Sequence, residues 1–180
     1  MYPAQKAPMP VDHEEIRDRF HRELGRLVHA CCLFDFNVGC ALNWLGPHNG
    51  KDVSQWLIGR VPLGKRLDAL KPLVLQTYRA AGRDAVAEFE AWFSKACELK
   101  AIRNDYVHAR WGVPGHSDSD DPVLKMLPMN WNFERDARDD SVDVKLSELR
   151  EQGTSIEQLS GEWFKLQKKY VNQATPRAKQ

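Results

Sequence analysis

Apolar residues recur at steps of three and four along the first quarter of the chain, and this spacing constrains the fold more than any other feature. Such steps place side chains on one face of an α-helix. Asp12 can cap this helix with Glu15 three residues on, and Gly46-Pro47 can end it. The sequence therefore predicts one long helix that other helices must cover. Its inward positions are Ile16, Phe20, Leu24, Leu27, Cys31, Phe34, Val38, Leu42 and Leu45.

Three further segments show the same periodicity. One runs from about residue 63 to 79 and contains Pro72, which predicts a kink. The next begins at a cap on Asp84 and ends at the "WGVPG" stretch. The last begins at Thr154, where Glu157 completes a second capping box. Large apolar residues occupy the inward positions: Leu67, Leu70, Val74 and Tyr78; Phe89, Trp92, Phe93, Ala96, Leu99, Tyr106 and Val107; Ile156, Leu159, Trp163, Leu166 and Tyr170.

Residues 122 to 147 break the helical period. Their Val and Leu residues alternate with polar ones, which predicts a small hairpin-like insert, and we expect any β-structure to be confined there. The predicted fold class is mostly all-α, an antiparallel four-helix bundle with a β-hairpin-like insert before the last helix. A single domain would span residues 12–172, between a flexible N-terminal arm at 1–11 and a tail at 173–180.

Composition narrows the class of protein. A chain of 180 residues can bury one sizeable core, and a formal net charge of +1 argues against a polybasic nucleic-acid coat or membrane anchor. No secretory leader or membrane-length apolar run is visible, so we expect a cytoplasmic protein without membrane contact. The four cysteines lie in helical patterns without a CxxC spacing, which predicts free thiols in the core.

Arg103 is the most unusual residue of the third helical segment. On a helical wheel it lies about 40° from the centre of the apolar face. An unpaired guanidinium buried there costs several kcal/mol. Asn104 and His108 lie one turn apart along the rim of the same face. Two interpretations remain open: a structural ion pair with Asp35, which interrupts the apolar face of the first helix, or a polar edge that lines a cleft or an interface.

The stretch "RNDYVH" resembles the Arg-x4–6-His signature of HEPN domains, in the form with a polar residue directly after the arginine. The bare pattern also occurs at Arg22–His29 and Arg110–His116, but only Arg103–His108 has the adjacent asparagine. It also lies late in the helix before the last one, as in that family. The resemblance covers residues 12–172 in architecture.

This resemblance implies a metal-independent endoribonuclease that works as a homodimer, with two motifs facing one cleft and no cofactor. The substrate's 2′-hydroxyl would attack and leave a 2′,3′-cyclic phosphate. His108 would move a proton, since imidazole titrates near neutral pH. Arg103 would stabilise charge on the phosphorane, and Asn104 would orient His108 or a phosphate oxygen. Candidates for RNA binding are Lys100 and Arg110 along the backbone and Tyr106 and Trp111 against a base.

Alternatives remain for several of these residues. Core packing is the competing role for Tyr106 and Trp111. The competing function is a non-catalytic HEPN-like helical module that binds RNA or a partner protein, with Arg103 in a structural ion pair. A toxin or defence role would add an antitoxin or regulatory protein as a partner. The stretch "GHSDSDD" gathers a histidine and three aspartates, but its spacing matches no closed metal site and favours a solvated turn.

Overall fold

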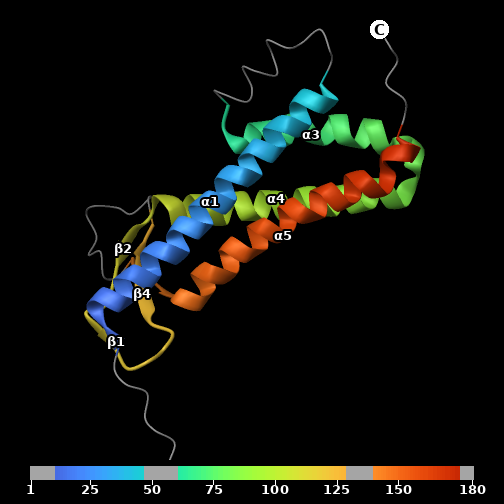
Figure 1. Cartoon of the computed structure of the whole chain (residues 1–180). Helices are drawn as coiled ribbons and strands as arrows, with labels where there is room; N and C mark the ends of the chain where they lie inside the picture. Colours follow the sequence, from blue (N-terminus) through green and yellow to red (C-terminus); the bar gives the residue numbers. More distant parts are fainter. Residues whose placement is uncertain (1–10, 47–60, 129–139, 175–180) are drawn as a thin grey trace, which may run out of the picture. The chain divides into compact units, whose positions relative to one another are not determined.

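A computed structural model describes residues 11–46, 61–128 and 140–174 of the chain (Figure 1). This part is mostly helical, as predicted. The long helices are α1 (His13–Leu45), α3 (Leu63–Tyr78), α4 (Arg83–His108) and α5 (Leu146–Tyr170). Single 3-10 turns, Arg79–Ala81 and Val171–Gln173, follow α3 and α5. Residues 1–10 of the expected arm, 129–139 of the insert and 175–180 of the tail lie outside the described residues.

Contacts between residues divide the chain into two compact units. Unit 1 is Met1–His29 with Arg103–Thr154, and unit 2 is Ala30–Ile102 with Ser155–Gln180. Helices α1, α4 and α5 each contribute residues to both units. The predicted four-helix bundle and the single domain over 12–172 stay predictions.

Unit 2 has an aromatic core. Tyr78 at the end of α3 stacks on Phe89 of α4, with ring centroids 4.5 Å apart. Trp92 lies 4.7 Å from Trp163 of α5, and its indole N–H donates to the carbonyl of Leu159 at 3.0 Å. The buried apolar positions of α3 are those that its periodicity predicts: Leu67, Leu70, Val74 and Tyr78. Helix α3 continues through Pro72.

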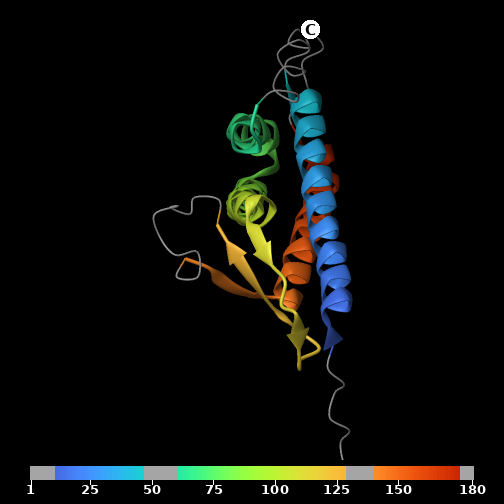
Figure 2. The ribbon, with the colours of Figure 1, turned by 90° about the vertical axis from the view of Figure 1, so that its left-hand side faces the viewer.

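Unit 1 holds a small antiparallel sheet of order β2-β4-β5, formed by Arg110–Gly112, Val123–Leu127 and Val142–Lys145. Leu124, Met126 and Val144 point to its buried side. Figure 2 shows the sheet beside the N-terminal part of α1. A second pair joins β1 (Val11–Asp12) to β3 (His116–Ser117). The predicted limit of β-structure to residues 122–147 is therefore wrong, because β2, β3 and β1 lie outside it.

Helix starts are right for α1 and wrong for α5. Asp12 caps α1, since the backbone N–H of Glu15 donates to its carboxylate at 2.9 Å. Helix α5 begins at Leu146 rather than Thr154, and the cap comes from Asp121, which accepts from the Ser147 N–H at 2.8 Å and from its hydroxyl at 2.6 Å. Thr154 instead lies inside the helix and donates to the carbonyl of Arg150.

The cysteines also differ from expectation. Cys31 is buried, as the core prediction requires, whereas Cys32, Cys40 and Cys97 are exposed. All are free thiols. The prediction of core positions is therefore wrong for three of the four, because these three lie away from the buried faces of their helices.

Candidate functional site

The side chains of Arg103, Asn104 and His108 meet at the C-terminal end of α4, in unit 1. Nη1 of Arg103 donates to Oδ1 of Asn104 at 2.9 Å and lies 3.4 Å from Nε2 of His108. A guanidinium only donates, so Nε2 of His108 faces the Arg103 donor as the accepting atom of this contact. The structure thus brings together the three residues for which the sequence predicts a catalytic role. Asn104, which was expected to orient His108 or a phosphate oxygen, contacts Arg103.

This cluster is open to solvent. Asn104 and His108 are exposed, and Arg103 is half-buried. The buried residues of α4 end at Ala96, and Tyr106 and Val107 beyond it are only half-buried. Burial of the apolar face of α4 therefore decreases towards its C-terminal end. The Arg103 guanidinium remains accessible to water or to a ligand.

Asp35, the carboxylate proposed for a structural ion pair with Arg103, forms an ion pair with Arg66 of α3. Nη2 of Arg66 lies 2.5 Å from Oδ1 of Asp35, and Nη1 of Arg66 donates to the Asp35 carbonyl at 3.4 Å. The side chain of Arg66 is only 8% exposed and that of Asp35 is 38% exposed. Sequence reasoning missed Arg66. The sequence signal that could have found Arg66 is its position four residues before Leu70, which places it on the inward face of α3.

Tyr106 and Trp111 pack within unit 1. The indole N–H of Trp111 donates to the carbonyl of Tyr106 at 3.0 Å, and their ring centroids are 5.7 Å apart. Trp111 also lies 5.4 Å from the buried ring of Phe20 on α1. Burial, together with the charges of Glu148 and Asp105, raises the pKa of the Tyr106 phenol, which stays protonated at neutral pH. These contacts support the packing role for both aromatics.

The two cations assigned to RNA binding lie in different units. Arg110 is exposed at the start of β2, where it pairs with Leu127 in the sheet register. Lys100 belongs to unit 2, is half-buried and lies against Gly64 at the start of α3. A Cβ atom at Gly64 would stand 2.9 Å from the Lys100 ammonium, so this close approach depends on glycine. Only Arg110 shares a unit with the Arg103 cluster.

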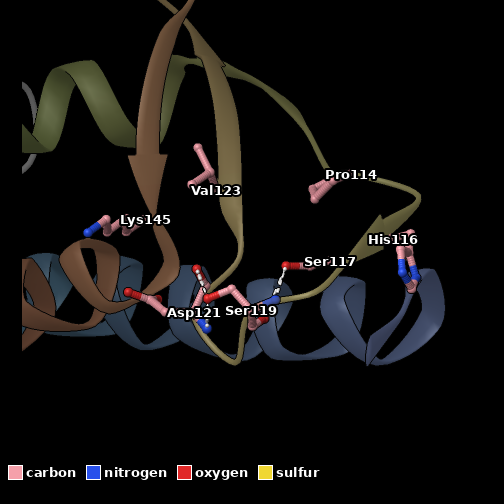
Figure 3. A pocket seen from close by; sticks show the side chains of 7 residues that line it. All are labelled: Pro114, His116, Ser117, Ser119, Asp121, Val123 and Lys145. Atoms are coloured by element: carbon pink, nitrogen blue, oxygen red, sulfur yellow. Dashed lines mark hydrogen bonds between the residues drawn. The ribbon is translucent and has the colours of Figure 1, made fainter. Parts of the chain in front are cut away.

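A second polar region of unit 1 is a hollow of about 330 Å³ beside β3 and β4 (Figure 3). Its hydroxyls bond within the loop: Ser117 donates to the carbonyl of Ser119, and Ser119 donates to that of Asp121. The Asp121 carboxylate caps α5. These hydrogen bonds join residues of the same loop, in agreement with the solvated turn inferred from the sequence. Among the residues that the structure describes, no group of three His, Cys, Asp or Glu side chains could hold a metal ion.

Comparisons of the chain with models of protein families, with curated proteins and with solved structures find no match. Within the described ranges, no helix combines the length and the apolar character needed to cross a membrane.

Proposed function

We propose that the chain is a metal-independent endoribonuclease of the HEPN type that works as a homodimer. The observation that carries the proposal is the contact of one guanidinium nitrogen, Nη1 of Arg103, with both Asn104 and His108 at an exposed helix end. An arginine, an amide and an imidazole within hydrogen-bond reach are the groups needed to bind a phosphate and to move a proton.

The reaction begins at the 2′-hydroxyl of the RNA. Its oxygen attacks the adjacent phosphorus while its proton passes to a base, and the P–O5′ bond breaks as the leaving oxygen takes up a proton. Nε2 of His108 offers the lone pair for the first transfer, and a second copy of the chain would supply the second imidazole. The products are a 2′,3′-cyclic phosphate and a 5′-hydroxyl.

Arg103 has a double role in this scheme. Before substrate binds, its contact with Nε2 orients the imidazole of His108. An incoming phosphate would attract the guanidinium away from the imidazole and free that lone pair. The planar fork would then stabilise the charge of the phosphorane. Asn104 would position the guanidinium through its 2.9 Å contact.

The alternative is a non-catalytic HEPN-like module that binds RNA or a protein. It requires Arg103 to be structural, yet Asp35 is already paired with Arg66. The two hydrogen-bonding partners described for Arg103 are uncharged groups on its own helix. This arrangement favours the catalytic role.

The test is incubation of the wild type with mixed single-stranded RNAs in EDTA, beside His108→Ala. The matched control is Arg22→Ala with His29→Ala, because this exposed pair on α1 also fits the bare Arg-x4–6-His pattern. We expect the wild type and the control to cleave, and His108→Ala to lose about hundredfold or more in rate. A wild type without cleavage, or an equal loss in the control, would contradict the proposal.

A further inference from the structure

One face of the β2-β4-β5 sheet in unit 1 carries a row of cations. Residues paired across strands, and residues two apart on one strand, lie on the same face of a sheet. The strand registers therefore define an outer face with six side chains: Arg110, Val123, Lys125, Leu127, Asp143 and Lys145. Trp111 of the opposite face contacts Phe20 of α1, so the outer face is turned away from α1 (Figure 2).

The three cations of this outer face lie on one diagonal. Lys125 is opposite Gly112, which is two residues along β2 from Arg110. Lys145 is opposite Val123, which is two residues along β4 from Lys125. Diagonal neighbours on adjacent strands have Cα atoms about 7–8 Å apart. Arg110, Lys125 and Lys145 therefore follow one another at nearly equal steps across all three strands.

The two lysines of the row can take an anion. Lys145 is exposed, and its ammonium has no hydrogen bond or ion pair within the described part of the chain. Lys125 forms an ion pair with Asp143, but their side chains are 61% and 59% exposed, and such surface pairs contribute little to stability. A phosphate can therefore replace Asp143 as the partner of Lys125. Arg110 has a further interaction within the chain, and only the two lysines are assigned a new partner.

The position of the row favours RNA as the anion. Arg110 follows His108 by two residues, so the near end of the row lies within about 8 Å of the His108 Cα atom. An RNA strand bound at the Arg103 cluster continues beyond the cleaved bond, and its successive phosphates can meet successive cations. An anionic membrane would also require a large apolar surface to insert, and the outer face offers only Val123 and Leu127.

We propose that the outer face of the sheet binds the RNA strand beside the cleaved bond, with phosphates at Lys125 and Lys145. This role rests on the proposed ribonuclease function and extends its site by a few nucleotides. Ammonium groups on flexible stems hold phosphates without reading bases, so the contact is independent of sequence. The loop before β4 carries Asp118, Asp120 and Asp121, whose charges repel a phosphate. The bound stretch therefore ends at Lys145.

The first experiment measures the affinity of the wild type for a labelled single strand of 2′-O-methyl RNA, which has no free 2′-hydroxyl and is not cleaved. Lys125→Ala and Lys145→Ala are compared with the control Lys165→Ala, which removes an exposed lysine of α5 in unit 2. We expect each of the first two to weaken binding about fivefold at low salt, because one phosphate contact is lost. Each should also reduce the slope of log affinity against log salt by about 0.7. The control should bind like the wild type.

Asp143 provides a sharper test, because its replacement should change the affinity in the opposite direction. Asp143→Asn removes the carboxylate that competes with a phosphate for Lys125, so it should tighten RNA binding about threefold. Glu151→Gln, which neutralises an exposed carboxylate of α5 in unit 1, is the matched control and should leave the affinity unchanged. If the ion pair only stabilised the sheet, Lys125→Ala and Asp143→Asn would both lower the melting temperature and would change binding in the same direction.

The outcomes separate this role from the ribonuclease function. Unchanged affinity in Lys125→Ala and Lys145→Ala, equal weakening by Lys165→Ala, or weaker or unchanged binding by Asp143→Asn would each overturn the proposal. If the wild type cleaves RNA while the lysine variants bind it normally, the ribonuclease function survives and the role of the face is rejected. Binding of RNA through both lysines without cleavage would support the role of the face and reject the ribonuclease function. Binding of polyglutamate in place of RNA would assign the face to an acidic protein and overturn the proposal.

Discussion

Two arginines of this chain lie on helix faces that the sequence pattern assigns to the core, and they differ in what they contact. Arg66 of unit 2 is almost fully buried and lies against the carboxylate of Asp35. Arg103 of unit 1 is half-buried and contacts an amide and an imidazole. The first guanidinium is neutralised by its partner. The second has no carboxylate among its described partners and is half-buried.

The difference in partners bears on the roles of the two arginines. A buried cation with a carboxylate is held in place, and losing either partner leaves an uncompensated group. A cation whose partners are uncharged can still form an ion pair with an anion such as a phosphodiester. The comparison therefore assigns a structural role to the Arg66 pair and supports the proposed role of the Arg103 cluster in substrate chemistry.

The largest effect is expected from a change in the RNA, which tests the chemical role proposed for the Arg103 cluster. If the Arg103 cluster uses the 2′-hydroxyl, replacing that hydroxyl by hydrogen at the cleaved position should reduce cleavage to background, because the nucleophile is gone. Analysis of the products from unmodified RNA should find a 2′,3′-cyclic phosphate. Cleavage of the deoxy-substituted strand at the same position would reject this mechanism.

A large effect on stability is expected at the other arginine. Asp35→Ala should lower the free energy of unfolding by about 3 kcal/mol, because it leaves the Arg66 guanidinium buried without its carboxylate. Arg66→Met should cost less, since the remaining Asp35 carboxylate is 38% exposed and can be hydrated. Denaturant unfolding of both variants and of the double variant measures this. Additive costs would show that the pair is not coupled.

A smaller loss is expected where Trp111 packs against Phe20 and Tyr106 in unit 1. Trp111→Ala should lower the free energy of unfolding by about 2 kcal/mol, because it removes the ring contacts with Phe20 and Tyr106. Trp111→Phe keeps a ring and loses the hydrogen bond to the Tyr106 carbonyl, so its cost should be about 1 kcal/mol. If both variants are as stable as the wild type, Trp111 is available for stacking on a base instead.

The smallest effect concerns pH. In unit 2 the Lys169 ammonium, hydrogen-bonded to Glu88 at 2.7 Å, holds the pKa of that carboxyl below 4.5. A lowered pKa contributes stability that is complete above pH 4.5 and is lost as the pH falls through the folded-state pKa. Melting temperature should therefore fall less steeply in acid for Lys169→Met than for the wild type, whereas Lys168→Met should behave like the wild type. Identical acid profiles for all three would contradict the assignment.

Local signals predicted much of this molecule. The periodicity of α1 and α3, the cap at Asp12 and the place of Arg103 near the end of a helix depend on residues that are close in sequence, and sequence spacing reports such features directly. The three site residues 103, 104 and 108 lie within two turns of one helix, which is why their meeting could be predicted.

Features that depend on distant residues could not be predicted in this way. The start of α5 is set by Asp121, which lies 26 residues before the Ser147 that it caps. The partner of Asp35 is 31 residues away on another helix, and periodicity does not identify which of several cations will reach a carboxylate. Strand β2 is only three residues long and is defined by its pairing with β4, so it carries no pattern of its own.

The most direct test of the central claim is the single-turnover rate of RNA cleavage by Arg103→Ala, measured in EDTA on protein whose melting temperature is known. Its reference variant is Asp35→Ala, assayed well below its own melting temperature. The account predicts that Arg103→Ala loses about hundredfold or more in rate while it melts close to the wild type. Asp35→Ala should melt lower and still cleave when folded. Cleavage by Arg103→Ala at the wild-type rate would show that its guanidinium is not part of the chemistry.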